Sequence, residues 1–400
     1  MERLIDHPAR ETNRDPAEIR RINLIPKDAL PYRALSGLDY DSGDFEAVME
    51  KGLNLAGWAG FDARRWESEA TGRLRGRGLA CYLEVTAPPR DEMGGIRFEA
   101  DGRVTLITGT LDYGQGHASA FAQVVSERLG VPFEKIDLVQ GDSDRLLAGG
   151  GTGGSRSIMA SGKALVDASL AVIEKGKALA ADRLEAAAAD IAFTLSDARD
   201  GVFRIKGTDR QIALLDLAAE THPADDVDGR ENSLNVALVA EAPPSAFPNG
   251  CHIAEVEIDP ETGAVSLERY VAVDDFGNLV NPMLAEGQVH GGVVQGISQA
   301  LMERTVYDES GQLLSGSFMD YALPRAGDLP MIHVGFHAVP ATSNPLGVKG
   351  CGEAGVTGAL PAVMNAINDA LSSVGAAHVD MPATAEDVWR ALAGCATNKR

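Results

Sequence analysis

The first twenty residues place apolar side chains at a helical spacing, with Leu4, Ile5 and Ile19 among them. Asp15 followed by Pro16 is typical of a helix start, because the Asp side chain accepts backbone N–H groups and proline fits the first helical turn. Residues 2–21 are therefore predicted to be helical, with no strand before them.

From Arg77 the pattern changes to short apolar runs with the two-residue period of strands. Strands are predicted at residues 79–86, 95–99, 104–108, 252–258 and 264–273. Asp101-Gly102 is typical of a type I′ hairpin turn, and residues 259–263 predict a second hairpin. A similar sheet edge is thus expected in each half of the chain.

Helical spacing returns between and after these strands. Helices are predicted at residues 118–129, 157–189, 289–302 and 361–372, the first of them ending at the C-cap residue Gly130. Residues 180–228 are polar and weakly patterned, so they are predicted to form an irregular surface connection between two lobes. The pattern as a whole predicts a mixed α/β (α+β) fold, and no internal sequence repeat is evident.

Composition narrows the possible functions. A net charge of −22 would repel phosphate backbones and anionic lipid, so nucleic acid and membranes are not expected as partners, although solubility is the simpler reason for the charge. No apolar run approaches the ~20 residues of a membrane helix, and the charged N-terminus does not resemble a signal peptide. The four cysteines are far apart and form no metal-binding or disulfide pattern. A cytoplasmic location is expected.

Glycine is unusually frequent, at 44 of 400 residues against a usual ~7%. The excess is concentrated in four loops, at residues 109–117, 149–157, 281–292 and 345–355. Glycine lets a backbone approach a ligand closely, as a phosphate or pterin site requires. Any single loop of this kind could also be an ordinary tight turn.

The first two loops argue against the common nucleotide sites. In the first, Ser119 stands where a GxGxxG fingerprint needs its third glycine, which leaves a nicotinamide site weakly supported. Its amides and the following helix start could still face an anion. The second loop offers amides, hydroxyl groups and Arg156 for a pyrophosphate, but it lacks the GK[ST] sequence of a P-loop.

The last two loops carry candidate polar groups. Gln288 could offer its amide to a heterocycle edge or simply bond within its own loop, and a structural role is favoured for His290. Glu353 lies among small residues of the fourth loop, where loss of water would make its carboxylate a stronger base. A solvated loop Glu is the alternative. Cys351 beside it is expected to be a small packed side chain.

Six segments in this order resemble the large subunit of molybdenum hydroxylases, the xanthine oxidase and aldehyde oxidase family with its carbon monoxide dehydrogenase branch. They are GTLDYGQGH, VQGDSD, GTGGSRS, NPMLAEGQVHGGVVQG, FMDYALP and GVKGCGEAG. The resemblance covers essentially the whole chain and implies a two-lobed molybdenum-cofactor-binding domain of the xanthine oxidase type. Each segment is weak alone, but the set is specific.

The resemblance also implies which residues form the site. Glu353 matches the family's catalytic glutamate. Molybdenum would be held by the pterin dithiolene and by no protein side chain. The implied cofactor-binding residues are Tyr113, Gly114, Gln115, Gly116, His117, Thr152, Gly153, Gly154, Ser155, Arg156, Ser157, Gln288, Lys349, Gly350, Cys351 and Gly352.

The activity implied is oxidative hydroxylation of an aldehyde or N-heterocycle, with water as the oxygen source. The cofactor would be molybdenum-molybdopterin, with its cytosine dinucleotide form as one option. Electrons would pass to a 2Fe-2S subunit and an FAD subunit. The family's preceding half of the large subunit does not occur in this sequence, so the chain is either a naturally split subunit, whose other half is a separate polypeptide, or an isolated fragment. The split subunit is the favoured hypothesis, and the chain alone is expected to be inactive. A dimer of the whole complex is a further option.

Four segments are expected on this basis: residues 1–30 as helices docking on the partner half, 31–180 as the first lobe, 181–230 as a surface connection and 231–400 as the second lobe with the Glu353 loop. Two other functions stay open. One is a non-catalytic cofactor-binding or assembly relative, which retention of Glu353 disfavours. The other is a nucleotide-dependent dehydrogenase, which the incomplete GxGxxG disfavours.

Overall fold

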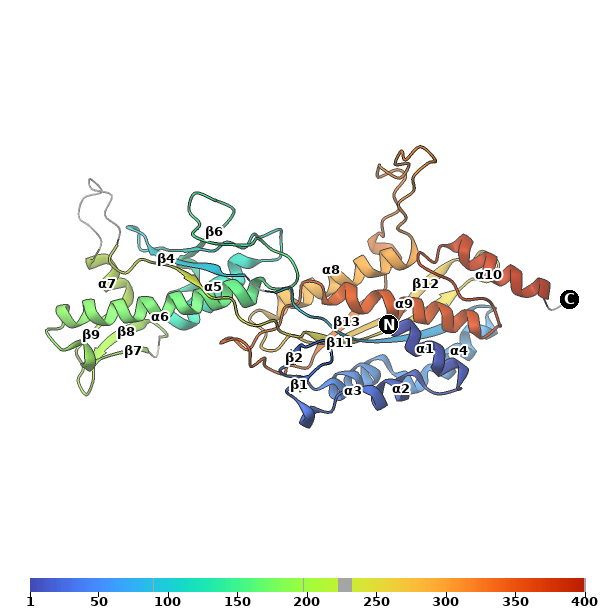
Figure 1. Cartoon of the computed structure of the whole chain (residues 1–400), viewed down its shortest axis with the longest axis horizontal. Coiled ribbons are helices and arrows are strands. Elements are labelled where there is room, and N and C mark those ends of the chain that lie inside the picture. Colours follow the sequence, from blue (N-terminus) through green and yellow to red (C-terminus); the bar gives the residue numbers. More distant parts are fainter. Residues whose placement is uncertain (89, 197, 222–231, 399–400) are drawn as a thin grey trace.

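The computed structural model describes residues 1–88, 90–196, 198–221 and 232–398. The chain forms an elongated molecule of two lobes, each built on a four-stranded sheet with long helices against it (Figure 1). The predicted mixture of helices and strands in a two-lobed fold is confirmed. Within these residues no helix combines the length and the apolar composition needed to cross a lipid bilayer.

The first sheet lies in the lobe drawn on the left of Figure 1. Its strand order is β10-β4-β5-β6, with β10 and β5 antiparallel to β4 and with β6 parallel to β5. The strands are β4 (Glu92–Phe98), β5 (Val104–Ile107), β6 (Ile136–Val139) and β10 (Val236–Ala240). Helices α5 (His117–Leu129) and α6 (Ser157–Arg183) bury their apolar faces against this sheet in one core.

The second sheet has the order β13-β12-β11-β3 and repeats the first sheet's pattern of directions. Its strands are β3 (Leu74–Leu83), β11 (Asn249–Ile258), β12 (Val265–Asp275) and β13 (Ile332–Phe336). Helices α8 (Pro282–Leu301) and α9 (Ala354–Ser372) share one core with the sheet. Helix α3 (Phe45–Ala56) contributes to a second core with the same strands.

The same order of elements therefore occurs in two successive units of the chain. Each unit has a hairpin, a helix, a strand parallel to the second strand of the hairpin, and a second helix. The fourth strand of each sheet is exchanged between the units. Strand β3 precedes the first hairpin in the chain but pairs with β11, and β10 precedes the second hairpin but pairs with β4. Because each lobe contains a strand from the other unit, the two units are joined by backbone hydrogen bonds within each sheet.

The N-terminal helices are present as predicted, as α1 (Glu2–Glu11) and α2 (Pro16–Asn23). Asp15 caps α2 and accepts the Ala17 N–H at 2.7 Å. Both helices lie against this chain's own β3, and buried Arg20 donates to the Leu79 carbonyl at 2.9 Å. Docking on a partner half stays a prediction, and such a contact would use the outer faces of these helices.

Other elements complete the fold. They are η1 (Lys27–Ala29), β1 (Tyr32–Arg33), β2 (Asp39–Tyr40), η2 (Trp58–Gly60), α4 (Phe61–Ala70), η3 (Phe133–Lys135), η4 (Ala188–Asp190), η6 (Ala326–Asp328) and α10 (Ala385–Asn398). Figure 1 also shows an extended arm between α8 and β13 that projects from the second lobe.

The prediction of an irregular stretch at residues 180–228 is wrong where the structure describes it. This stretch contains β7 (Ile191–Leu195), β8 (Gly201–Ile205), β9 (Gln211–Ala213) and α7 (Leu214–Glu220). Phe203 and Leu217 are buried in the same core as α6. The strands here are short and lie between charged turns, so the two-residue period of apolar side chains was not evident in the sequence. Residues 222–231, in the predicted connection, lie outside the described residues.

Three local predictions were also wrong. Helix α8 begins at Pro282 and α9 at Ala354, well before the predicted starts, and Pro361 lies inside α9. The turn at Asp101 has a positive φ only at Gly102, so it is a three-residue turn and not type I′. The segment boundaries at residues 30, 180 and 230 stay a prediction. Strands β3 and β10 each pair with a sheet on the other side of such a boundary.

Candidate functional site

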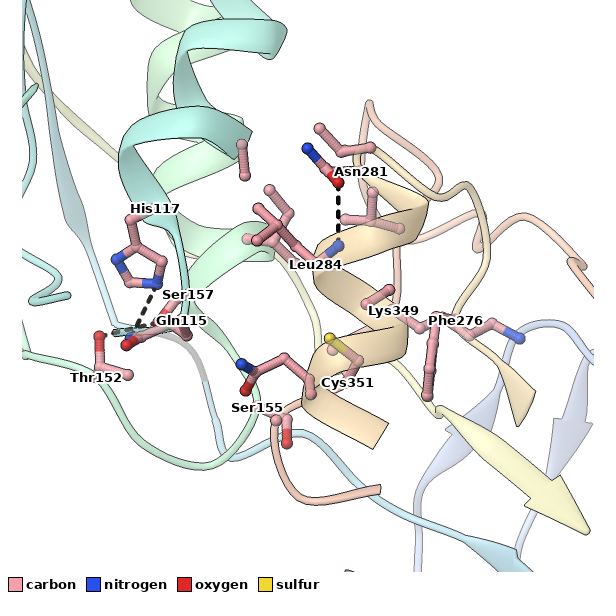
Figure 2. Close-up of a pocket in the computed structure, with 18 of the residues that line it drawn as sticks. Gln115, His117, Thr152, Ser155, Ser157, Phe276, Asn281, Leu284, Lys349 and Cys351 are labelled. Atoms are coloured by element: carbon pink, nitrogen blue, oxygen red, sulfur yellow. Dashed lines mark hydrogen bonds between the residues drawn. The ribbon is translucent and has the colours of Figure 1, made fainter. Parts of the chain in front are cut away.

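A cleft of about 570 Å³ lies between the two lobes. All four glycine-rich segments line it, the first two from the ends of β5 and β6 and the other two from the segments after β12 and β13 (Figure 2). The two repeated units thus present equivalent strand ends to one space. This is the region where α/β sheets commonly bind ligands, because helix starts and strand ends converge there.

The structure brings fifteen of the seventeen predicted residues to this cleft. They are Tyr113, Gly114, Gln115, His117, Thr152, Gly153, Gly154, Ser155, Ser157, Gln288, Lys349, Gly350, Cys351, Gly352 and Glu353. Gly116 and Arg156 are not among the lining residues. The Arg156 guanidinium donates instead to the Pro88 and Gly150 carbonyls, at 3.2 and 3.0 Å. These hydrogen bonds stabilise the backbone around the second loop, and the guanidinium does not extend a positive charge into the cleft.

The amides of the first loop are already occupied, contrary to the prediction that they face an anion. The Asp112 carboxylate accepts the N–H groups of Gly114 at 2.8 Å and of His117 at 2.8 Å. Burial acts to raise the pKa of Asp112, but these backbone N–H groups outweigh it and the pKa is lowered. Asp112 is therefore the charged cap of α5.

The first two loops meet at the backbone carbonyl of Leu111. The Thr152 hydroxyl donates to the Leu111 carbonyl at 2.7 Å, and the Gln115 amide donates to the same carbonyl at 3.0 Å. His117 is buried beside Gln115 and stacks on Phe121, with ring centroids 4.8 Å apart. Burial lowers the pKa of His117, although Asp112 opposes this, so the imidazole is neutral near pH 7.

The second and fourth loops meet at Ser155. Its φ of 56° lies in the left-handed region, which is uncommon for a residue other than glycine. A Cβ at Gly350 would lie 1.6 Å from the Ser155 carbonyl oxygen, so only glycine fits at that position. The Ser155 hydroxyl accepts the Glu353 N–H at 3.0 Å and lies 3.4 Å from the Glu353 carboxylate.

Lys349 lines the cleft without offering its charge to it. Its Nζ atom lies 2.6 Å from the Asp275 carboxylate, and both side chains are fully buried. Asp275 also accepts the Gly277 and Val339 N–H groups, both at 2.9 Å. The pair therefore fixes the fourth loop to the end of β12.

Glu353 is the residue immediately before α9, and its side chain is exposed in this chain. The predicted burial of this carboxylate is thus wrong for the described residues. The reason is geometric, because the second loop covers one side of Glu353 through Ser155 and the other side is open. Gln288 lies on α8 and not in a loop, since Asn281 caps that helix by accepting the Leu284 N–H at 3.0 Å.

Several residues of the site were missed in the sequence. The segment between β12 and α8 lines the cleft with Phe276, Asn278, Leu279, Val280 and Asn281. The pair Asn281-Pro282 is typical of a helix start. It could have predicted that this segment lies at the junction of a strand and a helix. Glu84, which follows β3, also interacts electrostatically with Glu353, although the two residues are 269 positions apart in the sequence.

The cleft fits a large cofactor with hydrogen-bonding groups along its edge. It is open beside the backbone, since a Cβ at Gly114 or Gly153 would meet no atom within 4 Å. Its polar lining consists of amide and hydroxyl side chains such as Gln288 and Ser157, suited to a heterocycle edge. No cluster of three or more His, Cys, Asp or Glu side chains occurs among the described residues. A metal here would need ligands supplied by its own cofactor.

Comparison with known proteins gives a consistent family. The molybdopterin cofactor-binding domain family matches residues 51–330. The carbon monoxide dehydrogenase large chain of Hydrogenophaga pseudoflava is 33% identical over 98% of this chain and 50% of its own length. The nicotine 6-hydroxylase large subunit of Paenarthrobacter nicotinovorans is 33% identical over 98% of this chain and 49% of its own length.

A solved structure agrees. Carbon monoxide dehydrogenase from Oligotropha carboxidovorans superposes with a TM-score of 0.89 and 30% identity, over 99% of this chain and 51% of that chain. The chain therefore spans about half the length of the relatives it matches.

Proposed function

Because this chain belongs to the molybdopterin cofactor-binding domain family, we propose that it is the cofactor-binding part of a molybdenum hydroxylase large subunit, with Glu353 as the base. The observation that carries the proposal is the convergence of four glycine-rich segments on one cleft that has Glu353 at its edge. The similarity to two large chains, over nearly the whole of this chain, supports it.

The residues that would hold the cofactor are those that line the cleft with amides and hydroxyl groups. Gln115 and Gln288 would face the pterin, and the loop from Thr152 to Ser157 would hold its phosphate region. Molybdenum, bound through the dithiolene of the pterin, would supply the two-electron oxidation of the substrate carbon, with water as the oxygen source. The cytosine dinucleotide form of the pterin stays an option.

Glu353 would take up the proton released as the water-derived oxygen bonds to carbon. Its position immediately before α9 places the carboxylate near the positive end of the helix dipole. A positioned carboxylate of this kind typically contributes ~10²–10⁴ in rate. The Ser155 hydroxyl and the Glu353 N–H hold the two loops in the geometry this requires.

The substrate class proposed is an aldehyde or an N-heterocycle. The relatives named above are described as acting on carbon monoxide and on nicotine, so the family's substrates differ widely. The partners proposed are the remaining half of the large subunit, a 2Fe-2S subunit and an FAD subunit. The exposed side of Glu353 supports a covering partner, because a base works best away from bulk water. A cytoplasmic location also stays a prediction.

The test is Glu353→Gln in the enzyme assembled with its partners. We expect molybdenum and pterin content to stay at the level of the unmodified protein, and turnover to fall by about 10²–10⁴. Glu268→Gln makes the same charge change at an exposed position on β12 and should change neither quantity. Retained turnover in Glu353→Gln would contradict the role of the carboxylate, and an enzyme with full turnover but no molybdenum would contradict the whole proposal.

A further inference from the structure

The side chain of Gln115 is held by two backbone groups of its own loop. Its Oε1 atom accepts the Tyr113 N–H at 2.5 Å, and its Nε2 atom donates to the Leu111 carbonyl at 3.0 Å. A backbone N–H can only donate and a backbone carbonyl can only accept, so these contacts fix which end of the amide is oxygen and which is nitrogen. The orientation of the Gln115 amide therefore follows from the backbone.

His117 takes the second N–H of this amide. The Gln115 Nε2 atom lies 3.2 Å from the His117 Nε2 atom (Figure 2). An amide nitrogen donates and does not accept, so the His117 Nε2 atom is the unprotonated acceptor of this hydrogen bond. A neutral imidazole carries its one proton on the other ring nitrogen, and the proton of His117 therefore lies on Nδ1.

Gln140, which directly follows β6, accepts that proton. Its Oε1 atom lies 3.4 Å from the His117 Nδ1 atom, and its Nε2 atom donates to the hydroxyl groups of Thr108 and Thr110 at 2.7 and 2.9 Å. The Thr110 hydroxyl lies 2.8 Å from the Ser161 hydroxyl, and both threonines and Ser161 are buried. The donor and acceptor roles are thus consistent from the loop backbone to the interior of the first lobe.

We infer that His117 and Gln140 are positioning residues that make Gln115 a hydrogen-bond acceptor only toward the group that binds in the cleft. Both N–H groups of Gln115 are used, one by the Leu111 carbonyl and one by His117, whereas its Oε1 atom has two lone pairs and gives one of them to the Tyr113 N–H. Because Gln115 lines the cleft, the other lone pair selects an N–H or O–H donor on the ligand.

The inference deepens the proposed function and rests on it, because the donor opposite Gln115 would be an amino group or a ring N–H of the pterin. It assigns a direction to this hydrogen bond and a role to Gln140, a residue that does not itself line the cleft. The hydrogen bonds of His117 and Gln140 are made within this chain, so they exist before any ligand binds.

The surroundings of His117 favour the neutral ring that this arrangement requires. Burial lowers the pKa of His117, and Asp112 and the Gln140 amide oppose this shift without reversing it. Among the described residues, Asp112 is the charged group that acts on this imidazole, and Phe121 stacks on the ring. A protonated His117 would direct an N–H at the Gln115 amide nitrogen, and the amide would then have to turn.

The test is Gln140→Glu in the enzyme assembled with its partners, with Gln211→Glu as the matched control. The carboxylate would lie beside His117 Nδ1 and raise the pKa of the imidazole, so that Nε2 gains a proton as pH falls. At about pH 6.5 we expect the molybdenum cofactor to dissociate about ten times faster than from the unmodified enzyme, which corresponds to the loss of about one hydrogen bond. At about pH 8.5, where the imidazole is neutral again, the two rates should be equal.

The control makes the same substitution at an exposed position of the same lobe. Gln211 lies on β9 and its Oε1 atom accepts from the Arg204 side chain at 2.9 Å, as a carboxylate also can. Gln211→Glu should therefore release the cofactor at the unmodified rate at both pH values. Equal rates in Gln140→Glu and the control at the lower pH would overturn the inference.

Two substitutions of His117 separate hydrogen bonding from packing. His117→Gln keeps an acceptor oxygen for the Gln115 amide, whereas His117→Leu keeps an apolar contact with Phe121 and removes the acceptor. We expect His117→Leu to release the cofactor about ten times faster than the unmodified enzyme, and His117→Gln to stay within about threefold of it. A role in packing alone predicts the opposite order, and that order would overturn the inference.

Nitrogen-15 NMR of the assembled enzyme, with labelled histidine in this chain, measures the protonation directly. A bare ring nitrogen and an N–H give separate signals, and the signals of His117 are those missing in His117→Leu. At about pH 7 we expect a proton on Nδ1 and none on Nε2. A proton on Nε2 would overturn the inference, because the Gln115 amide could not donate to it.

These outcomes are separable from failure of the proposed function, because the NMR measurement does not depend on turnover. If Glu353→Gln loses turnover as expected while His117 carries its proton on Nε2, the inference is wrong and the proposed function stands. If the assembled protein binds no molybdenum while the proton lies on Nδ1, the proposed function is wrong and Gln115 is the acceptor for a different ligand.

Discussion

At the scale of single residues, several charges that the sequence offers to a ligand are used inside the protein. Lys349 is paired with Asp275 in the interior, and Arg156 donates to two backbone carbonyls. Asp112 caps the helix start that was expected to bind an anion. The cleft therefore presents mainly neutral amides and hydroxyl groups, and Glu353 is the exposed carboxylate at its edge.

The buried pair makes a stability prediction. Lys349→Met would remove the cationic partner of the buried Asp275 carboxylate, which should lower the free energy of unfolding by about 3–5 kcal/mol. Lys163→Met is a suitable control, because Lys163 pairs with Asp167 one helical turn away in a partly exposed position, and its loss should cost less than about 1 kcal/mol. Chemical denaturation measures both. Equal losses of unfolding free energy in the two variants would show that the buried pair contributes no more to stability than the Lys163–Asp167 pair.

At the scale of elements, the glycines of the third and fourth segments have two different uses. Those at the loop contacts allow the backbone to approach Ser155, whereas Gly292 allows α8 to approach α9. A Cβ at Gly292 would lie 2.9 Å from the Gly355 Cα atom and 3.0 Å from the Val356 nitrogen, both of them backbone atoms. Part of the glycine excess therefore serves helix packing and not cofactor binding.

Two adjacent glycines of α8 test this point. Gly292→Ala should destabilise the protein by about 1–3 kcal/mol, because α9 must move to admit the methyl group. A Cβ at Gly291 meets no atom within 4 Å, so Gly291→Ala should be neutral or should stabilise by up to about 1 kcal/mol through helix propensity. Thermal denaturation of the two variants compares them directly. A stabilising Gly292→Ala would rule out the close helix contact.

At the scale of the whole molecule, the exchanged strands β3 and β10 join the two lobes. Removing either unit, together with the strand it exchanges, would leave the sheet of the other unit without an edge strand and with an unpaired row of backbone groups. The two lobes are therefore expected to unfold together, although each has its own hydrophobic core.

The three tryptophans allow this to be measured, because Trp58, Trp66 and Trp389 all lie in the lobe of the second sheet. Trp58 is buried there, so its fluorescence reports on one lobe, whereas far-ultraviolet circular dichroism reports on both. In urea the two signals should give one coincident transition. A fluorescence transition separated from the circular dichroism transition would show that the lobes unfold independently.

The hairpins, the N-terminal helices and the four glycine-rich segments could be predicted from the sequence, because these features depend on residues close together in the chain. Tertiary structure decided which charged groups are free. The partner of Lys349 is the distant Asp275, and the partners of Arg156 are backbone carbonyls. The exchange of β3 and β10 could not be predicted either. The period of apolar residues predicts a strand, but it does not show which distant strand pairs with it.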